Sequence, residues 1–197
     1  MSQPERREAA LLNTELRNFT RLSEVLDPEK VLELANDFFS LAAMAITANR
    51  GKVLSVQNDM LLSAFSSQDR QKFCEHALKA AQDIQREFGP MADEWKSSYG
   101  FPAAVSSAVH LGEAVFGMAG PIASQQFVGF GDCVSIVDRL VHRARSGEIV
   151  FSLDFMKVLS PATVKAIAAE ELPPLELARR SPIRIYGLPL EKRLDFT

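Results

Sequence analysis

The sequence is poor in cysteine and has no long apolar segment. Its two cysteines, Cys74 and Cys133, form no C-x-x-C pair, which argues against a disulfide framework and against a cysteine-ligated metal site. Reduced thiols are the simplest interpretation, and they favour a cytoplasmic protein. The polar start, MSQPERREAA, lacks the apolar region of a signal peptide, and no apolar run approaches the length of a membrane span. We therefore expect a soluble protein with no membrane partner.

Strong charge of one sign is also missing. The formal net charge is −3, and no lysine or arginine block of useful length occurs, which argues against a nucleic-acid-binding protein. What is present is a globular composition, with 47% hydrophobic and 24% charged residues, and without internal repeats or low-complexity tracts. A chain of 197 residues predicts one domain, over residues 1–197, with a full hydrophobic core.

Apolar periodicity in the first half of the chain alternates between strand and helix patterns. It predicts a strand over 8–16, a polar turn over 17–25, a helix over 28–50, two strands around a tight turn at 57–59, a helix over 68–88 and a connection over 89–102. The first helix has the expected signals: Asp27 can cap it, Pro28 suits its first position, and Gly51 ends it.

The second half continues the alternation. It predicts a pair of strands over 103–120 that turn at 111–113, a loop over 121–126, a strand up to 130, a helix from Asp132, a strand over 148–152, a helical segment over 153–168, and an edge strand at the end of 172–188 with its prolines outside the strand. Strands and helices alternate, and two hairpins break the strict order. The pattern predicts an α/β sandwich, with helices packed on a mixed sheet.

Two carboxylates stand out by their positions. Glu15 ends the first predicted strand, and Asp59 lies in the tight hairpin turn. Neighbouring strand ends can bring two such groups within reach of one divalent ion. Acidic residues in turns are more often simply solvated, so the pattern by itself does not establish a metal site.

Four blocks of the chain carry a family resemblance. TELRNFTRLSEVLDPEKVLELANDFF is similar to the motif ADIRGFTxLSExLxPEEVxxLLNxYF, and ANRGKVLSVQNDMLLSAF to xxxGGxVDKFIGDALMAVF. AVHLGEAVFGMAG is similar to GIHTGEVVAGNIG, and FVGFGDCVSIVDRLVHRARSGEIVFS to YTVIGDTVNLAARLEGxAxPGEILVS. These are motifs of the class III nucleotidyl cyclases, the adenylate/guanylate cyclase catalytic domains, and the resemblance runs from about residue 8 to residue 188. It implies a ferredoxin-like type of α/β sandwich with a mixed, mostly antiparallel sheet flanked by helices.

The resemblance implies a metal site at Glu15 and Asp59. In this family two aspartates bind two magnesium or manganese ions, and the aspartates fall on these two positions. Glu15 keeps the charge, but its extra methylene displaces the carboxylate, whereas active-site geometry tolerates only about half an ångström. We expect binding of Mg or Mn to be weakened or limited to one ion.

The resemblance also implies a nucleotide site whose usual side chains are largely replaced. The purine-reading lysine of the family falls on Ser55, and its partner, usually Asp or Thr in adenylate cyclases, falls on Val128. The transition-state asparagine falls on Ser135, while the phosphate-binding arginine is retained as Arg139. Ser55 is too short to reach a base edge, Val128 offers no hydrogen bond, and Ser135 has one donor with which to orient a ribose. Arg139 could clamp a phosphate or form a salt bridge at a subunit interface.

A turn beside Phe19 and Thr20 is the phosphate neighbour that the resemblance implies. Asn18 stands there in place of the usual glycine, so close approach of the backbone to a phosphate is in question. His110, in a predicted strand, is better interpreted as a packed core histidine. Cys133 follows Asp132 at a helix start, which could lower its pKa, although a small buried residue is the simpler interpretation.

Three functional hypotheses remain open. The first is a homodimeric cyclase-homology domain with little or no cyclase activity, which binds a nucleoside triphosphate or a signalling partner protein. The second is an active cyclase with a low rate or an altered base specificity. The third is a pseudo-subunit of a composite cyclase, because sites of this family lie between two chains, with the metal carboxylates from one and the Asn/Arg pair from the other.

Overall fold

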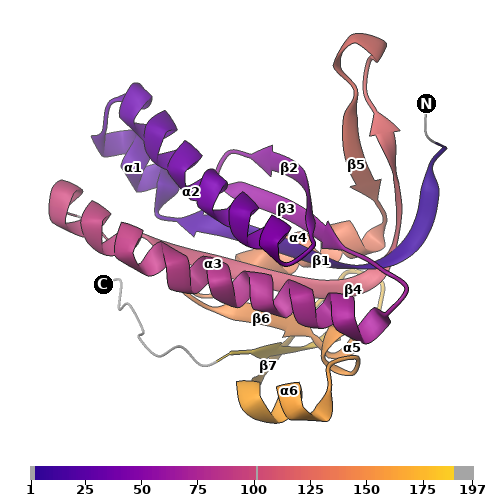
Figure 1. The fold of residues 1–197 in the computed structure, drawn as a ribbon. Coiled ribbons are helices and arrows are strands. Elements are labelled where there is room, and N and C mark those ends of the chain that lie inside the picture. The colour runs from indigo at the N-terminus through magenta and orange to yellow at the C-terminus, as the bar shows by residue number, and fades with distance from the viewer. Residues whose placement is uncertain (1–2, 101, 189–197) are drawn as a thin grey trace.

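The computed structural model describes residues 3–100 and 102–188. Figure 1 shows a twisted central sheet with helices on both sides of it. The described strands form one eight-stranded sheet in the order β2-β3-β1-β4-β6-β8-β7, with β5 paired to β4. Of the described strand pairs only β4–β6 is parallel, which confirms the predicted mixed, mostly antiparallel sheet.

The first half of the chain forms one long strand, a hairpin and the helix pair that covers one face. Its elements are β1 (Glu5–Arg17), α1 (Phe19–Val25), α2 (Pro28–Ala48), β2 (Lys52–Gln57), β3 (Met60–Phe65) and α3 (Arg70–Tyr99). The predicted strand, helix and hairpin around residues 57–59 are confirmed. Pro28 occupies the first turn of α2 as predicted, but the side chain of Asp27 makes no capping hydrogen bond.

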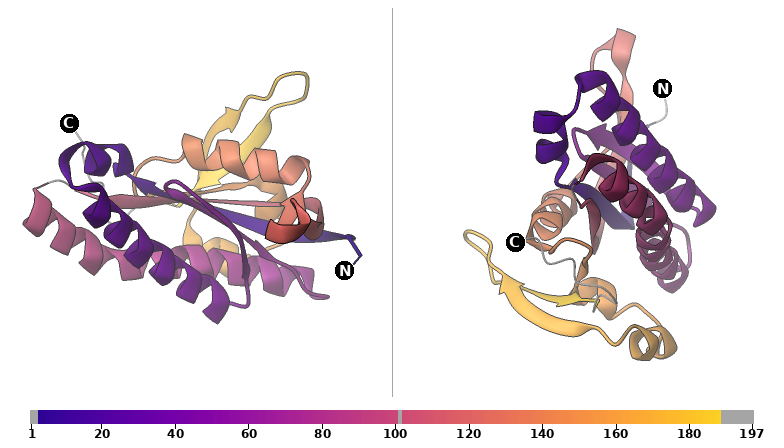
Figure 2. Two further views of the ribbon diagram at one scale, coloured as in Figure 1. Left: turned by 90° about the horizontal axis from the view of Figure 1, so that it is seen from above. Right: turned by 90° about the vertical axis from the view of Figure 1, so that its left-hand side faces the viewer.

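The second half supplies the centre of the sheet and its opposite layer. Its elements are β4 (Ala104–Ala119), the short 3-10 helix η1 (Ile122–Ser124), β5 (Gln126–Phe130), α4 (Asp132–Arg143), β6 (Ile149–Ser152), α5 (Leu153–Met156), α6 (Pro161–Ile167), β7 (Glu170–Leu175) and β8 (Ile183–Gly187). Figure 2 shows α4 on one side of the sheet and the pair α2 and α3 on the other.

Alternation along β1 assigns its side chains to these two layers. Ala10, Leu12 and Leu16 belong to the core cluster beneath α2 and α3. Ala9 and Leu11 belong to the cluster beneath α4. Because side chains of a strand point to opposite faces in turn, the odd-numbered residues that follow Leu11 face α4. This places Asn13, Glu15 and Arg17 on the α4 side of the sheet.

Five local predictions are wrong. The polar segment 17–25 contains helix α1 rather than only a turn, and the predicted connection 89–102 is mostly the second half of α3, which has Pro90 in its interior. Residues 103–120 form the single strand β4, without a turn at 111–113. Among the C-terminal strands the sheet edge is β7, which contains the prolines, while β8 lies between β6 and β7. After α2 the left-handed residue is Arg50 (φ 64°), not Gly51.

One expectation about membranes also needs correction. By length and composition, α2 is long and apolar enough to cross a membrane, with 21 residues and a mean hydropathy of 1.4 in its most apolar window. Eight of its side chains are buried: Val31, Leu34, Ala35, Phe38, Leu41, Ala42, Ala45 and Ile46. Six of the eight belong to the cluster shared with α3 and the sheet, so this face of α2 is a core face.

Candidate nucleotide and metal site

The carboxylate of Glu15 is buried beneath α4 and held by the chain's own cationic side chain. Its residue exposure is 8%, and its Oε1 accepts a hydrogen bond from Arg17 Nη1 at 2.8 Å. The imidazole Nδ1 of His142 lies 3.6 Å from Oε2. Burial raises the pKa of Glu15, against the lowering effects of Arg17 and His142, and the nearby Asp59 raises it further. The environment therefore disfavours the charged form on balance.

Arg17 is fixed by groups other than Glu15. Its Nε donates to Ser106 Oγ at 2.9 Å, and its Nη2 donates to the carbonyl oxygens of Val141 and Ala144 at the end of α4. The guanidinium is a planar, pre-organised set of donors, and these three bonds hold it in place even if Glu15 moves or is protonated. Glu15 is thus attracted toward a fixed cation inside the fold.

Asp59 lies at the mouth of the same cleft. The turn is tied to β1, since the backbone N–H of Leu16 donates to the Asp59 carbonyl at 2.8 Å. A cleft of about 760 Å³ has Glu15, Asp59, Phe19 and Thr20 in its wall, together with Arg21 and Arg145. The structure therefore brings together the two predicted metal residues and the predicted phosphate neighbours.

Glu15 and Asp59 offer few ligands for a metal ion. Glu15 Oε2 is buried and has no hydrogen-bond partner among the described residues, so this oxygen has no protein donor to displace. The described residues contain no group of three or more His, Cys, Asp or Glu side chains that could hold a metal ion. Any ion must also compete with Arg17 for the carboxylate.

Asn18 keeps the backbone geometry that the usual glycine would give. Its φ of 67° lies in the left-handed region, which asparagine tolerates better than most residues. Its Nδ2 donates to the carbonyl of Pro102 at 2.8 Å. The substitution therefore preserves the turn before Phe19 and adds a bond to the segment that leads into β4.

Ser135 and Arg139 lie on the exposed face of α4, outside this cleft. The buried residues of α4 are Cys133, Ile136, Val137, Leu140 and Val141. At the start of the helix, Arg180 pairs with Asp132 through both carboxylate oxygens. This pair lowers the pKa of Asp132, and Arg139 contributes to the lowering. Arg139 faces outward, available to a neighbouring molecule.

Ser55 and Val128 are half-buried on two strands that approach each other. A Cβ added to Gly129 would lie 3.4 Å from Leu54 Cδ1, and Lys52 Nζ lies 3.4 Å from the centroid of the Phe127 ring. The two predicted base-reading positions therefore belong to one surface, which carries neither a charged base reader at 55 nor a hydrogen-bonding side chain at 128.

The other candidates are structural. His110 is 5% exposed, and its Nδ1 lies 2.8 Å from Ser152 Oγ, which confirms the packed, hydrogen-bonded histidine. Burial lowers the pKa of His110 to about 4. Cys133 is buried as expected, but burial raises its pKa, so the helix start does not produce a reactive thiolate.

The residues that the sequence did not single out are Arg17 and His142. Arg17 was visible beside Glu15 in the RNFT turn, and alternation along a strand places residues 15 and 17 on the same face. His142 follows Arg139 by three residues, close to one helical turn, and its approach to Glu15 depends on how α4 packs on β1. The available sequence signal was the spacing of Glu15 and Arg17, two residues apart at the end of the first predicted strand.

Known proteins resemble this chain in sequence and in fold. The family described as "Adenylate and Guanylate cyclase catalytic domain" matches residues 1–188. Adenylate cyclase 1 of Rhizobium meliloti (strain 1021) is 25% identical over 137 residues, covering 68% of this chain and 20% of that protein. The chain thus spans about a fifth of the length of the curated relative that it matches.

Solved structures share the fold. The adenylyl cyclase CyaB from P. aeruginosa has a TM-score of 0.87 at 19% identity and covers 100% of both chains. The guanylyl cyclase Cya2 has a TM-score of 0.82 at 21% identity, over 95% of this chain and 94% of that one. A guanylate cyclase domain from Catenaria anguillulae, solved in complex with GTP, has a TM-score of 0.78 at 15% identity, over 95% of this chain and 100% of that one.

Proposed function

Since this chain belongs to the adenylate and guanylate cyclase catalytic domain family, we propose that it is a dimeric cyclase-homology module with little or no cyclase activity. It binds a nucleoside triphosphate or a signalling partner protein in the cytoplasm. The absence of disulfides supports that location, because both cysteines are free and buried.

The state of Glu15 carries the proposal. Its Oε1 is bound to Arg17 at 2.8 Å, and Arg17 has three further acceptors that keep it in place. A metal ion must therefore share the Glu15 carboxylate with a fixed guanidinium, in a buried environment that raises the pKa of Glu15. Two-metal phosphoryl chemistry depends on carboxylates that are ionised and free to coordinate.

Glu15 and Asp59 are the residues that would hold magnesium or manganese. A bound ion would neutralise triphosphate charge and assist deprotonation of the ribose 3′-hydroxyl. Arg21 and Arg145, in the wall of the same cleft, supply positive charge that phosphates can use without a metal. Nucleotide binding thus survives more readily than turnover.

The positions that contact ribose and base weaken turnover independently. Ser135 is exposed on α4 and has one hydroxyl where the family uses an amide. Loss of a comparable positioning group costs roughly 10²- to 10³-fold in rate. Ser55 and Val128 leave the polar edge of a purine without its usual partners.

Dimerisation is supported by the division of the site. Glu15 and Asp59 lie in one cleft, whereas Ser55, Val128, Ser135 and Arg139 do not line it. In a dimer, a second copy of the chain can bring its Ser135 and Arg139 to the Glu15 cleft of the first copy. Large apolar side chains are exposed on the strands that carry Ser55 and Val128, among them Val56 of β2 and Phe130 of β5. One similar solved structure, from Blastocladiella emersonii, is described as a non-canonical dimeric guanylyl cyclase domain.

An active cyclase with altered base preference is the second candidate. The orphaned Oε2 of Glu15 beside Asp59 favours it, because one coordination position survives. Ser55 and Val128, which lack the usual base-reading groups, then suit a base that differs from adenine and guanine. A pseudo-subunit is the related third case, in which a catalytic partner supplies the missing groups.

The deciding experiment is a titration of the purified protein with Mn²⁺ and each of ATP, GTP, CTP and UTP. Calorimetry follows binding, and chromatography follows cyclic product, with an ordinary family member measured in parallel. We expect binding of at least one nucleotide, and cyclisation of ATP and GTP that is absent or at least about 10³-fold slower. Turnover of ATP at an ordinary rate overturns the proposal. Turnover confined to CTP or UTP establishes the second candidate, and Arg139→Ala must then abolish it.

A further inference from the structure

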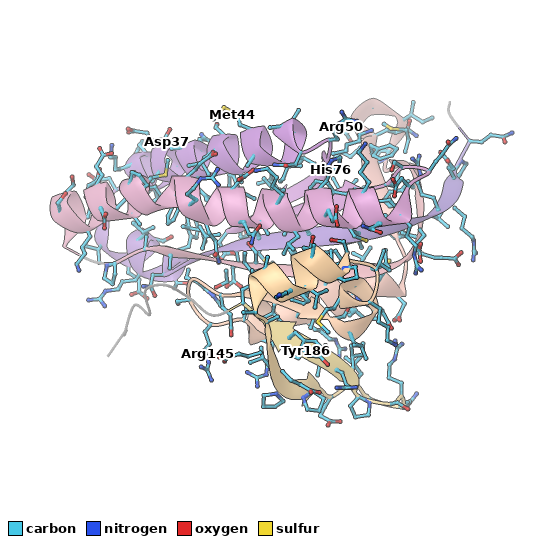
Figure 3. All side chains as sticks on the ribbon, turned by 60° about the horizontal axis from the view of Figure 1, so that its bottom comes forward. Asp37, Met44, Arg50, His76, Arg145 and Tyr186 are labelled. Carbon is cyan, nitrogen blue, oxygen red and sulfur yellow. The ribbon has the colours of Figure 1, made fainter. Side chains whose placement is uncertain are left out.

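A second cleft lies between α2 and α3, away from the Glu15 cleft. Its volume is about 330 Å³. Its walls come from the first half of α2 and the last half of α3, and the two walls share no residue with the Glu15 cleft. In Figure 3, Asp37 on α2 lies in the upper part of the view and Arg145, from the Glu15 cleft, in the lower part.

The floor of this cleft is apolar and the rim is acidic. Leu34, Pro90, Met91 and Trp95 provide apolar surface, and Trp95 is only 3% exposed. Four carboxylates surround them: Glu33 and Asp37 on α2, Glu87 and Glu94 on α3. The cationic residue in the wall is Lys30, so the cleft carries a formal charge of about −3.

Lys30 shows which chemistry the cleft accepts. Its Nζ lies 2.7 Å from Glu33 Oε1 and 6.0 Å from the centroid of the Tyr99 ring. An ammonium group is therefore held by a carboxylate and a tyrosine side chain, partners that favour cations at protein surfaces. Asp37 and Glu94 have no ion-pair partner among residues 3–100 and 102–188, so two similar positions remain open.

Trp95 adds a hydrogen-bond donor that has no partner among residues 3–100 and 102–188. Within the described part of the chain its indole N–H has no hydrogen-bond acceptor, and it is not among the fully enclosed unpaired atoms. The N–H of a nine-tenths buried tryptophan that lines a cleft and lacks a protein partner is available to a ligand in that cleft. A peptide carbonyl is the commonest acceptor that a protein partner offers.

We infer that the α2–α3 cleft binds a basic segment of a partner protein. One apolar side chain of the segment lies on Leu34, Met91 and Trp95. Lysine or arginine residues on either side pair with Asp37 and Glu94, and a backbone carbonyl accepts from the Trp95 indole. The inference does not depend on cyclase activity, because the cleft shares no residue with the nucleotide and metal site.

The test uses an acetylated eight-residue peptide, KLLKKLLK, and the tryptophan emission of the protein. Trp95 is the single tryptophan of the chain, and the peptide has none, so the emission reports on this cleft alone. We expect saturable quenching or a spectral shift at micromolar peptide, weakened by added salt. The matched peptide ELLEELLE should cause no change.

Charge-reversal variants separate the cleft from the general charge of the protein. Asp37→Lys with Glu94→Lys should weaken peptide binding at least about tenfold. Glu170→Lys with Glu176→Lys makes the same change in net charge on and beside β7 and should leave binding unchanged. Circular dichroism confirms that both variants fold.

Three outcomes overturn the inference. The first is the absence of any response of Trp95 to the basic peptide. The second is equal weakening in both charge-reversal variants, which would reduce the effect to net charge. The third is binding of spermine as tight as that of the peptide, which would assign the cleft to small polycations and remove the role of the apolar floor.

Discussion

A single methylene decides how the carboxylate at position 15 is used. The longer arm of Glu15 allows Oε1 to reach Arg17 Nη1 at 2.8 Å, beneath the last turn of α4. A family aspartate at this position is shorter by one methylene and would end short of that contact. The position keeps a carboxyl group, but its partner is a residue of the same chain.

Glu15→Asp should therefore restore cation binding at this cleft. We expect Mn²⁺ affinity to rise about tenfold, since the ion no longer competes with Arg17 for the carboxylate. Electron paramagnetic resonance of free Mn²⁺ measures this directly. Glu15→Gln is the matched control and should bind less Mn²⁺ than the unaltered protein. Equal affinities in Glu15→Asp and Glu15→Gln would show that position 15 takes no part in metal binding.

His110 should make stability depend on pH in acid. Its pKa is about 4 in the folded protein and near 6.5 in the unfolded chain, so below pH 6.5 the unfolded state binds more protons. Its contribution is present above pH 6.5 and is lost as the pH falls toward 4, by on the order of 3 kcal/mol. Urea unfolding from pH 7.5 to 4.5 tests this, with His110→Gln as control. The variant should lose stability less steeply, and parallel curves would exclude His110 as the cause.

The site could be predicted from sequence only as a set of positions. Glu15, Asp59, Phe19 and Thr20 were assigned to one site by motif, and the cleft contains all four. The sequence motif does not reveal that Arg17 donates to the carbonyls of Val141 and Ala144. These carbonyls lie at the end of α4, more than a hundred residues later in the chain. Partners distant in sequence decide whether a retained charge is free.

At the scale of elements, α3 shows why local signals misled. Gly89 and Pro90 predict a break, and an interior proline costs about 3 kcal/mol. The helix nevertheless continues to Tyr99. Phe88 and Trp95 lie on either side of the proline, 5.5 Å apart between ring centroids, and Phe38 of α2 packs on Phe88 at 5.8 Å. Burial of two large aromatic side chains offsets the cost of the proline.

Pro90→Ala should stabilise the protein. Alanine restores a backbone N–H for the carbonyl of Arg86 and relieves the clash of the proline ring, while proline's restriction of the unfolded chain is lost. We expect a net gain of about 1–2 kcal/mol in the free energy of unfolding, measured by urea denaturation. Gly89→Ala, next to it and with open space at the Cβ position, is the control for helix propensity alone and should gain less than about 1 kcal/mol. A destabilised Pro90→Ala would indicate that the proline supports the packing of Trp95.

Strand β4 shows the same kind of error, because a turn was predicted where the strand is continuous. Gly112 predicted a turn, yet it pairs with Ala9 inside a continuous ladder between β1 and β4. A Cβ at this position would lie 2.7 Å from Cys133 Cβ, so the glycine allows α4 to approach the sheet. The reason for the glycine is a contact between elements, which a local sequence pattern does not contain. The helices and strands with strong periodicity were, by contrast, predicted correctly.

For the whole molecule, we expect a homodimer formed through β2, β5 and α4. Light scattering of the purified protein should give twice the chain mass at micromolar concentration. Val56→Glu with Phe130→Glu places charges on side chains that are 48% and 66% exposed, and should produce a monomer. Leu32→Glu with Met44→Glu makes the same change on α2, at 63% and 65% exposure, and should remain dimeric. A monomeric unaltered protein, or monomers from both variants, would refute this interface.

Restoring the family residues at positions 15, 55, 128 and 135 in this dimer should recover cyclase activity. Asp59 and Arg139 are already in place, one in the Glu15 cleft and the other on the exposed face of α4. An aspartate at 15 releases the carboxylate from Arg17, and a lysine at 55 with an aspartate or threonine at 128 reads adenine. An asparagine at 135 orients the ribose. Because these groups act together across two chains, single substitutions should do little, and the combination should exceed their sum.

The quadruple variant Glu15→Asp, Ser55→Lys, Val128→Asp, Ser135→Asn should therefore form cyclic AMP from ATP with Mn²⁺, at least about tenfold above the unaltered protein. Val128→Thr replaces Val128→Asp in a parallel version. Adding Arg139→Ala to the active variant is the control and should abolish the gain, because the phosphate contact is lost. If the folded, dimeric variant binds ATP without cyclising it, the barrier lies in the geometry around Arg17, and adding Arg17→Ala should release it. If the variant neither binds nor cyclises ATP, the backbone of the cleft has changed beyond what these four side chains can restore.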